Sequence, residues 1–335
     1  MNFSNSLASV AAVSLTLILP ACSAQRASLL PPTVIAQSAC HAPAQAGSRN
    51  SHVKPDIDEI VWKSCTHNGD NCECAYNMSN HPPTLDVYAC EGASYAAFGL
   101  AATPKLTYAG FNNSVLVFAG KKRVATLEGL TGDPVGLAVD HFGNVWATDS
   151  PSATISEFAG GATKPTATYT DSNLTSASYL AVDTAGNVYL EGQAAYSIEV
   201  DELPEGGTTF TPIAKPGTVG LSAGGLAVQN AGTKTYVWIN DQGTAGSPAA
   251  ISRYLLKGSS LSSTGSFKYS GVDGAIWADP AGKHLSRVFA INNVVDGSEY
   301  ASSAVEYSMP GGKIVNATAA STSSTEAIGI AGAYK

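Results

Sequence analysis

A short apolar run centred on an aromatic residue recurs along this chain, and it constrains the fold more than any other feature of the sequence. Runs of small residues recur with it, as in Gly136-Leu-Ala-Val-Asp140, and an Asp-x-x-Gly turn joins the two kinds of run in the clearest copies. The small-residue runs begin about 37 to 54 residues apart, a period typical of repeat folds. The aromatic centres are Trp62, Tyr108, Trp146, Tyr189, Trp238 and Phe289, and the small-residue runs start at Gly99, Gly136, Tyr179, Gly225, Ala275 and Gly329.

Each repeat has the pattern of four strands. The small-residue run suits a strand near a crowded axis, and the Asp-x-x-Gly turn favours a hairpin because Asp bonds its own backbone while Gly adopts a positive φ. The aromatic run is the second strand. We expect a third strand at residues 154–158 and a fourth at residues 167–170. Four strands per unit with no helical pattern between them predict an all-β fold, the β-propeller.

The two ends of the repeat region predict a closed ring of six blades. Gly329-Ile-Ala has a first-strand sequence with no second strand after it, whereas residues 59–62 form a second strand with no first strand before it. Pairing the C-terminal strand with the segment around Trp62 completes one blade and removes an open sheet edge. We therefore expect six four-stranded blades over residues 56–335.

The repeat resembles the NHL-type propeller family, and more loosely the exported bacterial lipoproteins that carry such repeats. The resemblance rests on residues 136–149 and their copies. It implies the architecture and says little about activity, because propellers host unrelated functions.

Composition excludes some classes of function. The chain has 335 residues, of which 44% are hydrophobic and 13% charged, so a large core can form. The net charge is −8, and the basic triplet Lys121-Lys122-Arg123 is interpreted as a solvated turn. Because phosphate binding needs a basic face, we expect no nucleic acid partner.

The N-terminus predicts export. Residues 7–19 form an apolar stretch that is shorter than the roughly 20 residues of a membrane span and suits a signal peptide over residues 1–22. Leu19-Pro-Ala-Cys22 resembles a bacterial lipobox, which implies a lipid on Cys22, and cleavage near Ala24 is the alternative. Residues 23–55 are expected to form a flexible tether. We expect an extracytoplasmic protein, either secreted or anchored to the bacterial cell envelope, that meets the membrane only through this lipid.

Four cysteines, Cys65, Cys72, Cys74 and Cys90, belong to the first blade. We expect residues 64–83 to form a Cys-rich loop insertion between the second and third strands of that blade. Thiols of exported proteins oxidise, so the sequence favours two disulfides that join Cys72 and Cys74 to Cys65 and Cys90, in an order left open. A zinc site that includes His67 and His81 is the alternative. Cys40 lies in the tether without an assigned partner.

Four oxygen-bearing residues are candidates for a ligand or metal site. Asp149, Asp241 and Asn292 each follow an aromatic centre by three residues, and Glu191 follows one by two. They start loops that join second to third strands, on the face where the central channel opens. Such oxygens suit Ca²⁺ or Mg²⁺, and the alternative is that they simply begin turns.

The ring of oxygen ligands suggests a metal-assisted lactonase resembling the SMP-30/gluconolactonase propellers, in which a metal polarises a carbonyl and activates water. A lyase resembling virginiamycin B lyase would need a histidine base on this face. His141 and His284 instead belong to turns between first and second strands, on the opposite face, so we expect both to be exposed turn residues. Catalytic residues stay unassigned.

The sequence therefore predicts a binding or interaction module that presents one loop-bearing face, including the Cys-rich segment, to a protein or glycan. The alternative is the lactonase-like, metal-dependent hydrolase.

Overall fold

A computed structural model describes residues 59–67, 70–78, 84–90, 99–195, 197–213, 223–242, 249–269, 274–282, 285–296, 299–318, 321–323 and 330–334. Every regular element in these ranges is a β-strand. The described strands belong to one compact unit, residues 54–335. The predicted signal peptide, the tether, Cys22, Cys40, His81 and His284 lie outside the described residues.

The strands form six sheets, and neighbouring strands in each sheet are antiparallel. The first sheet has the order β25 (Ile330–Tyr334), β1 (Glu59–His67), β2 (Asp70–Asn77), β3 (Thr84–Cys90). The second sheet has the order β4 (Leu100–Ala102), β5 (Thr107–Phe111), β6 (Ser114–Ala119), β7 (Lys122–Leu127). The third sheet has the order β8 (Leu137–Val139), β9 (Val145–Asp149), β10 (Thr154–Phe158), β11 (Ala167–Thr170).

The remaining sheets repeat this order. The fourth sheet contains β12 (Ser176–Val182), β13 (Val188–Ala194), β14 (Ser197–Leu203), β15 (Thr211–Pro212). The fifth sheet contains β16 (Ala223–Ala231), β17 (Lys234–Asp241), β18 (Ala250–Lys257), β19 (Ser260–Lys268). The sixth sheet contains β20 (Ile276–Trp277), β21 (Arg287–Asp296), β22 (Glu299–Ser308), β23 (Lys313–Ala317), and β24 (Ser321–Ser323) pairs with β22.

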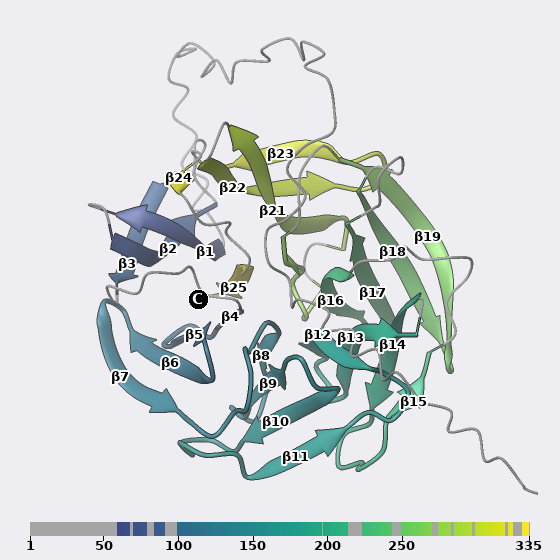
Figure 1. Cartoon of the computed structure of the whole chain (residues 1–335). Helices are drawn as coiled ribbons and strands as arrows, with labels where there is room; N and C mark the ends of the chain where they lie inside the picture. Colours follow the sequence, from purple (N-terminus) through teal and green to yellow (C-terminus); the bar gives the residue numbers. More distant parts are fainter. Residues whose placement is uncertain are drawn as a thin grey trace, which may run out of the picture. The chain divides into compact units, whose positions relative to one another are not determined.

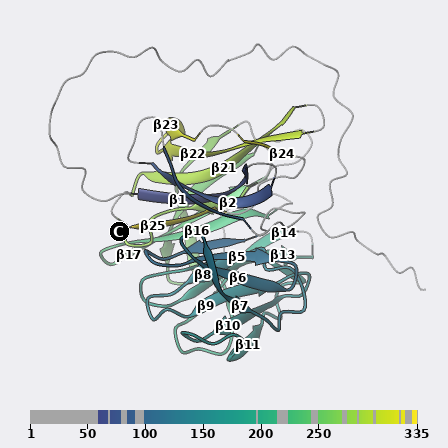
Figure 2. The ribbon, with the colours of Figure 1, turned by 90° about the vertical axis from the view of Figure 1, so that its left-hand side faces the viewer.

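The sheets are arranged as the blades of a propeller. The first strand of each sheet lies innermost, and the innermost strands β4, β8, β12, β16, β20 and β25 contact one another in that order. Figures 1 and 2 both place the sheet of β8–β11 on the opposite side of the unit from the sheet of β20–β23. The chain is thus an all-β propeller with four-stranded antiparallel blades, as the repeat predicts.

The aromatic centres lie in the second strands and fill the layers between sheets. Tyr108, Trp146, Tyr189, Trp238 and Phe289 are all buried. In the same sheets, the large apolar residues that end the expected third strands lie in β6, β10, β14, β18 and β22. The strand expected at residues 167–170 is β11. Burial of these side chains between neighbouring sheets is what stabilises a fold with no helices in its described part.

The Asp of the repeated turn organises both the turn and the aromatic centre. Asp140 Oδ1 accepts hydrogen bonds from the amides of Phe142 and Asn144, both at 2.9 Å, and Oδ2 accepts one from Trp146 Nε1 at 3.0 Å. Asp183 accepts equivalent amide bonds one blade later, and Tyr189 donates its hydroxyl to Asp183 Oδ2 at 3.3 Å. One carboxylate therefore positions a hairpin and a core side chain together.

The first sheet differs from the expectation in one respect. Most of residues 64–83, expected as a loop insertion, are strand, because β1 continues to His67 and β2 follows at Asp70. His67 pairs with Asp70 across Asn68-Gly69, the dipeptide that most favours a two-residue hairpin. Counted outward from β25, β2 is the third strand of this sheet and β3 is the fourth. Tyr88, which was expected in the third strand, consequently lies in the fourth and outermost one.

The C-terminal strand pairs with the start of the described region. In the register of β25 with β1, Trp62 lies opposite Ala331 and Val61 opposite Gly332. Between the first and sixth sheets, the buried Lys63 donates from Nζ to the Ser302 carbonyl at 2.8 Å. Asn316 Nδ2 donates to the Met78 carbonyl, also at 2.8 Å. The first and the last described strands therefore belong to one sheet.

Candidate functional site

The second strands carry polar residues that connect neighbouring blades. The residue two positions past the aromatic centre is Thr148 in β9, Glu191 in β13 and Asn240 in β17. Thr148 Oγ1 lies 3.3 Å from the Ser178 carbonyl of the fourth sheet, and Asn240 Nδ2 donates at 2.8 Å to the Gly274 carbonyl, just before β20. We call these three side chains the inter-blade braces.

Glu191 has the same role, although it was predicted as a metal or ligand candidate. Its side chain is fully buried, and Oε2 accepts a hydrogen bond from the Gly225 amide of the fifth sheet at 3.2 Å. In β5 the equivalent residue is Gly110, where an added Cβ would lie 2.5 Å from the Pro134 carbonyl oxygen. The neighbouring blade thus approaches the backbone itself at that position.

Asp149 holds a connection between blades. Its carboxylate accepts hydrogen bonds from the Thr131 amide at 2.9 Å, from Thr131 Oγ1 at 2.8 Å, and from the Gly132 amide. Residues 131 and 132 lie between β7 and β8, so this side chain fixes the segment that joins the second sheet to the third. In this structure, both oxygens of this candidate ligand therefore accept hydrogen bonds.

The other two candidates occupy positions equivalent to that of Asp149. Asp241 is the last residue of β17, and Asn292 lies within β21, opposite Ser303. Both side chains are half-buried. Glu191 is two residues past its aromatic centre, whereas Asp149, Asp241 and Asn292 are three residues past theirs. Successive residues of a strand face opposite sides of the sheet. Glu191 is therefore on the opposite side of its blade from the side that the other three occupy in theirs. Asp149, Asp241 and Asn292 thus occupy equivalent positions in their blades, and Glu191 does not.

Within the described ranges, no group of three or more His, Cys, Asp or Glu side chains is close enough together to hold a metal ion. His141 lies in the turn before β9 and stacks on the exposed ring of Phe142, with ring centroids 3.7 Å apart. In the same part of the chain, no helix is long and apolar enough to cross a bilayer.

The cysteine positions of the first sheet are neighbours in the strand register. Cys72 lies opposite Cys65 of β1 on one side and opposite Cys90 of β3 on the other. Cys74 is two residues further along β2, and its side chain is buried. Opposite residues, and residues two apart in a strand, occupy the same face of a sheet. Cys65, Cys72 and Cys90 therefore occupy one row across the three strands, and Cys74 is a diagonal neighbour of Cys65 and Cys90.

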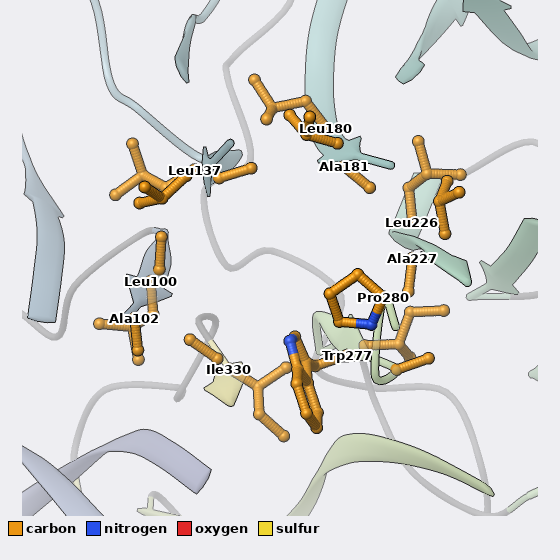
Figure 3. Close-up of a pocket in the computed structure, with 18 residues that line it drawn as sticks. Leu100, Ala102, Leu137, Leu180, Ala181, Leu226, Ala227, Trp277, Pro280 and Ile330 are labelled. Carbon is orange, nitrogen blue, oxygen red and sulfur yellow. The ribbon is translucent and has the colours of Figure 1, made fainter. Parts of the chain in front are cut away.

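The channel at the axis is narrow and lined by the innermost strands. Leu100, Leu137, Leu180, Leu226, Trp277 and Ile330 contribute to its wall (Figure 3). Its cavity volume is about 120 Å³, whereas pockets for drug-sized ligands usually have roughly 300–1,000 Å³. The channel has room for a few water molecules or a small apolar group, so a larger ligand would bind outside it.

Sequence reasoning missed a pair of buried acids between the third and fourth sheets. Asp171 follows β11, Asp201 lies in β14, and both side chains are almost fully buried, with 1% and 0% of their area exposed. Burial raises the pKa of Asp201 to about 7. The hydrogen bond from Asn173 opposes the rise, while the neighbouring carboxyls of Asp171 and Glu199 add to it. No repeat marks this pair, because it joins two different blades.

These strands, blades and braces define the chain as a β-propeller. No family model and no curated protein matches it. Among solved structures, a chain of a nidogen/laminin complex is similar, with a TM-score of 0.57 and 17% identity over 82% of this chain and 98% of that one. A chain of Kuenenia stuttgartiensis hydrazine synthase is similar with a TM-score of 0.47 and 14% identity, over 74% of this chain and 80% of that one. At such identities the likeness to the first of these shows the fold alone.

Proposed function

We propose that this protein is a binding module that engages a protein ligand through the face bearing its second-to-third-strand and blade-linking loops. The observation that carries the proposal is the use of Asp149, Glu191 and Asn240, which all brace backbone on this face. A braced frame holds loops in one conformation and so lowers the ordering cost of association. These contacts support a rigid platform over a hydrolase in which the same oxygens would have to bind a metal.

Two further observations support this reading. The channel is smaller than the usual site for an organic ligand, which directs recognition to the outer loops. The similar chain of the nidogen/laminin complex comes from a structure of a protein–protein complex, so this architecture accommodates a protein ligand elsewhere.

We also propose that the ring has six blades of NHL type and that β25 closes it within the first blade. The pairing of Trp62 with Ala331, and the succession of contacts among six innermost strands, support this count. Closure suits a binding module, because it removes the sheet edge on which other chains would aggregate.

For the first blade we propose two disulfides that join Cys72 and Cys74 to Cys65 and Cys90. Cys72 lies opposite both Cys65 and Cys90, and strands in such a register bring opposite Cα atoms to roughly 4.5–5.5 Å, within the range of a disulfide. Cys74 is a diagonal neighbour of the same two residues and would pair with the one that Cys72 leaves. Export with a lipid on Cys22 completes the proposal, since oxidised cysteines suit an extracytoplasmic site. Mass spectrometry of unreduced peptides tests the disulfides, and the mass of the mature N-terminal peptide tests the lipid.

Binding is tested with envelope and secreted proteins of the source cell, crosslinked to the purified protein and then titrated individually. We expect one protein to bind, with about tenfold weaker affinity for the loop-face variant Glu128→Lys/Thr175→Lys. The matched variant Thr184→Lys/Glu205→Lys changes exposed residues on the opposite face and should bind normally. Equal binding by both variants, or turnover of lactones lost in Asp149→Ala, would contradict the proposal.

A further inference from the structure

The acids between the third and fourth sheets present an unusual electrostatic arrangement. Asp171 Oδ1 accepts the Asn173 amide at 2.9 Å, and Asp201 Oδ2 accepts Asn173 Nδ2 at 2.9 Å. The remaining oxygens, Asp171 Oδ2 and Asp201 Oδ1, are buried and receive no hydrogen bond. Asn173 thus donates to both carboxyl groups and brings them to the same place in the fold. Two buried carboxylates that face each other must be neutralised by something that lies between them.

The surroundings supply negative charge rather than positive charge. Glu199 lies two residues before Asp201 on the same face of β14. Ser197 Oγ donates to Glu199 Oε1 at 3.3 Å. Within the described ranges, the ion pair found joins Arg287 to Glu306, in the sixth sheet. The described residues at this place thus supply oxygen atoms of like charge.

We propose that Asp171, Asp201 and Asn173 form a binding site for a calcium ion between the third and fourth blades. Carboxylate and side-chain amide oxygens are the ligands that Ca²⁺ prefers, and Ca²⁺ tolerates an irregular ligand set. Asp171 Oδ2 and Asp201 Oδ1 supply the charged ligands. Asn173 supplies its amide oxygen after the amide turns over, since the two ends of this group have the same shape.

Access to the site is through Asn173. This residue and Ser172 are exposed, whereas both acids are buried and accept hydrogen bonds from Asn173. Water can therefore complete the coordination from the outer side, as calcium sites commonly require. With two charged ligands we expect modest affinity, a Kd on the order of 10⁻⁴–10⁻³ M.

The experiment compares melting temperatures of the purified protein at pH 7.5 in EDTA and in about 5 mM calcium chloride. We expect calcium to raise the Tm of the wild type by about 3 °C or more, because a ligand of the folded state stabilises it. Asp201→Asn should melt above the wild type in EDTA and lose the response to calcium. Glu205→Gln removes the same charge from an exposed residue and should respond as the wild type does.

Isothermal titration calorimetry provides a second readout that does not depend on unfolding. One calcium site in the wild type, absent in Asp201→Asn, supports the proposal, and Asp171→Asn replaces that variant if circular dichroism shows it misfolded. A wild type that ignores calcium in both measurements overturns the proposal, even if Asp201→Asn is more stable, because a shared proton then neutralises the pair. A calcium response that persists in both Asp→Asn variants also overturns it.

Discussion

At the scale of the single residue, the carboxylate of the Asp-x-x-Gly turn organises the blades that contain this turn. Asp183 accepts two backbone amides, the Asn187 side-chain amide at 3.0 Å and the Tyr189 hydroxyl, although only 4% of its area is exposed. Gly186 has a φ of 96°, which a larger residue would adopt only with strain. The residue pattern read from the sequence therefore has a direct physical basis in these bonds.

We expect Asp183→Ala to lower the free energy of unfolding by about 2–4 kcal/mol, because it leaves several buried donors without an acceptor. Urea denaturation of the purified protein measures the change. Thr184→Ala removes an exposed side chain from the same turn and should cost less than about 0.5 kcal/mol. Equal losses for the two variants would show that the carboxylate has no special role.

At the scale of elements, neighbouring blades are joined by polar contacts as well as by apolar layers. The inter-blade braces place an oxygen or amide two residues past the aromatic centre, where it reaches backbone of the next blade. The pair of Asp171 and Asp201 also joins two blades, but it brings together like charges. The braces satisfy hydrogen-bonding groups of the next blade, whereas the contribution of the acidic pair to stability depends on what neutralises its charge.

The acidic pair predicts a pH dependence of stability in EDTA. Burial raises the pKa of Asp201 from 3.8 to about 7, so the folded state binds a proton that the unfolded chain releases. The stabilisation is complete below about pH 4 and is lost as the pH rises through about 7. We expect the Tm of the wild type to fall across this interval.

Asp201→Asn provides the comparison for that prediction. The variant carries no charge at this position, so its Tm should decline less between pH 4 and 7, and the two curves should separate most at neutral pH. Differential scanning calorimetry at several pH values measures both. Parallel curves for wild type and variant would place the titrating groups elsewhere in the molecule.

At the scale of the whole molecule, the C-terminal strand is innermost in the sheet that begins the described region. Ile330 and Ala331 are buried, and Ile330 belongs to a hydrophobic cluster with residues of the fourth, fifth and sixth sheets. If β25 closes the ring, as we propose, the ring unfolds as a unit, because loss of this strand would expose the layers on both of its sides.

Deleting residues 325–335 should therefore lower the free energy of unfolding by more than about 3 kcal/mol and broaden the melting transition. The milder variant Ile330→Ala should cost about 2–4 kcal/mol. Val124→Ala shortens a half-exposed side chain on β7 and is the matched control, with little change expected. A truncated protein that melts as sharply as the full chain, and at the same temperature, would rule out closure of the ring by β25.

Much of this architecture was predictable, and the exceptions have identifiable reasons. The strand pattern around Trp146 and Tyr189 is local, so the repeat located those strands and their buried faces correctly. The pairing of His67 with Asp70 was missed because the cysteines on both sides of it suggested a loop. Glu191 was grouped with Asp149 because the two are close in alignment, yet a shift of one residue in a strand moves a side chain to the opposite face.

By itself, the sequence determined the repeated strands, their turns and the core aromatic residues, since each depends on neighbours within a few positions of the chain. The tertiary structure alone decided which backbone Glu191 and Asn240 brace and that Asp171 faces Asp201. Those contacts join different blades, and their geometry depends on how two sheets pack, which no local pattern of residues encodes.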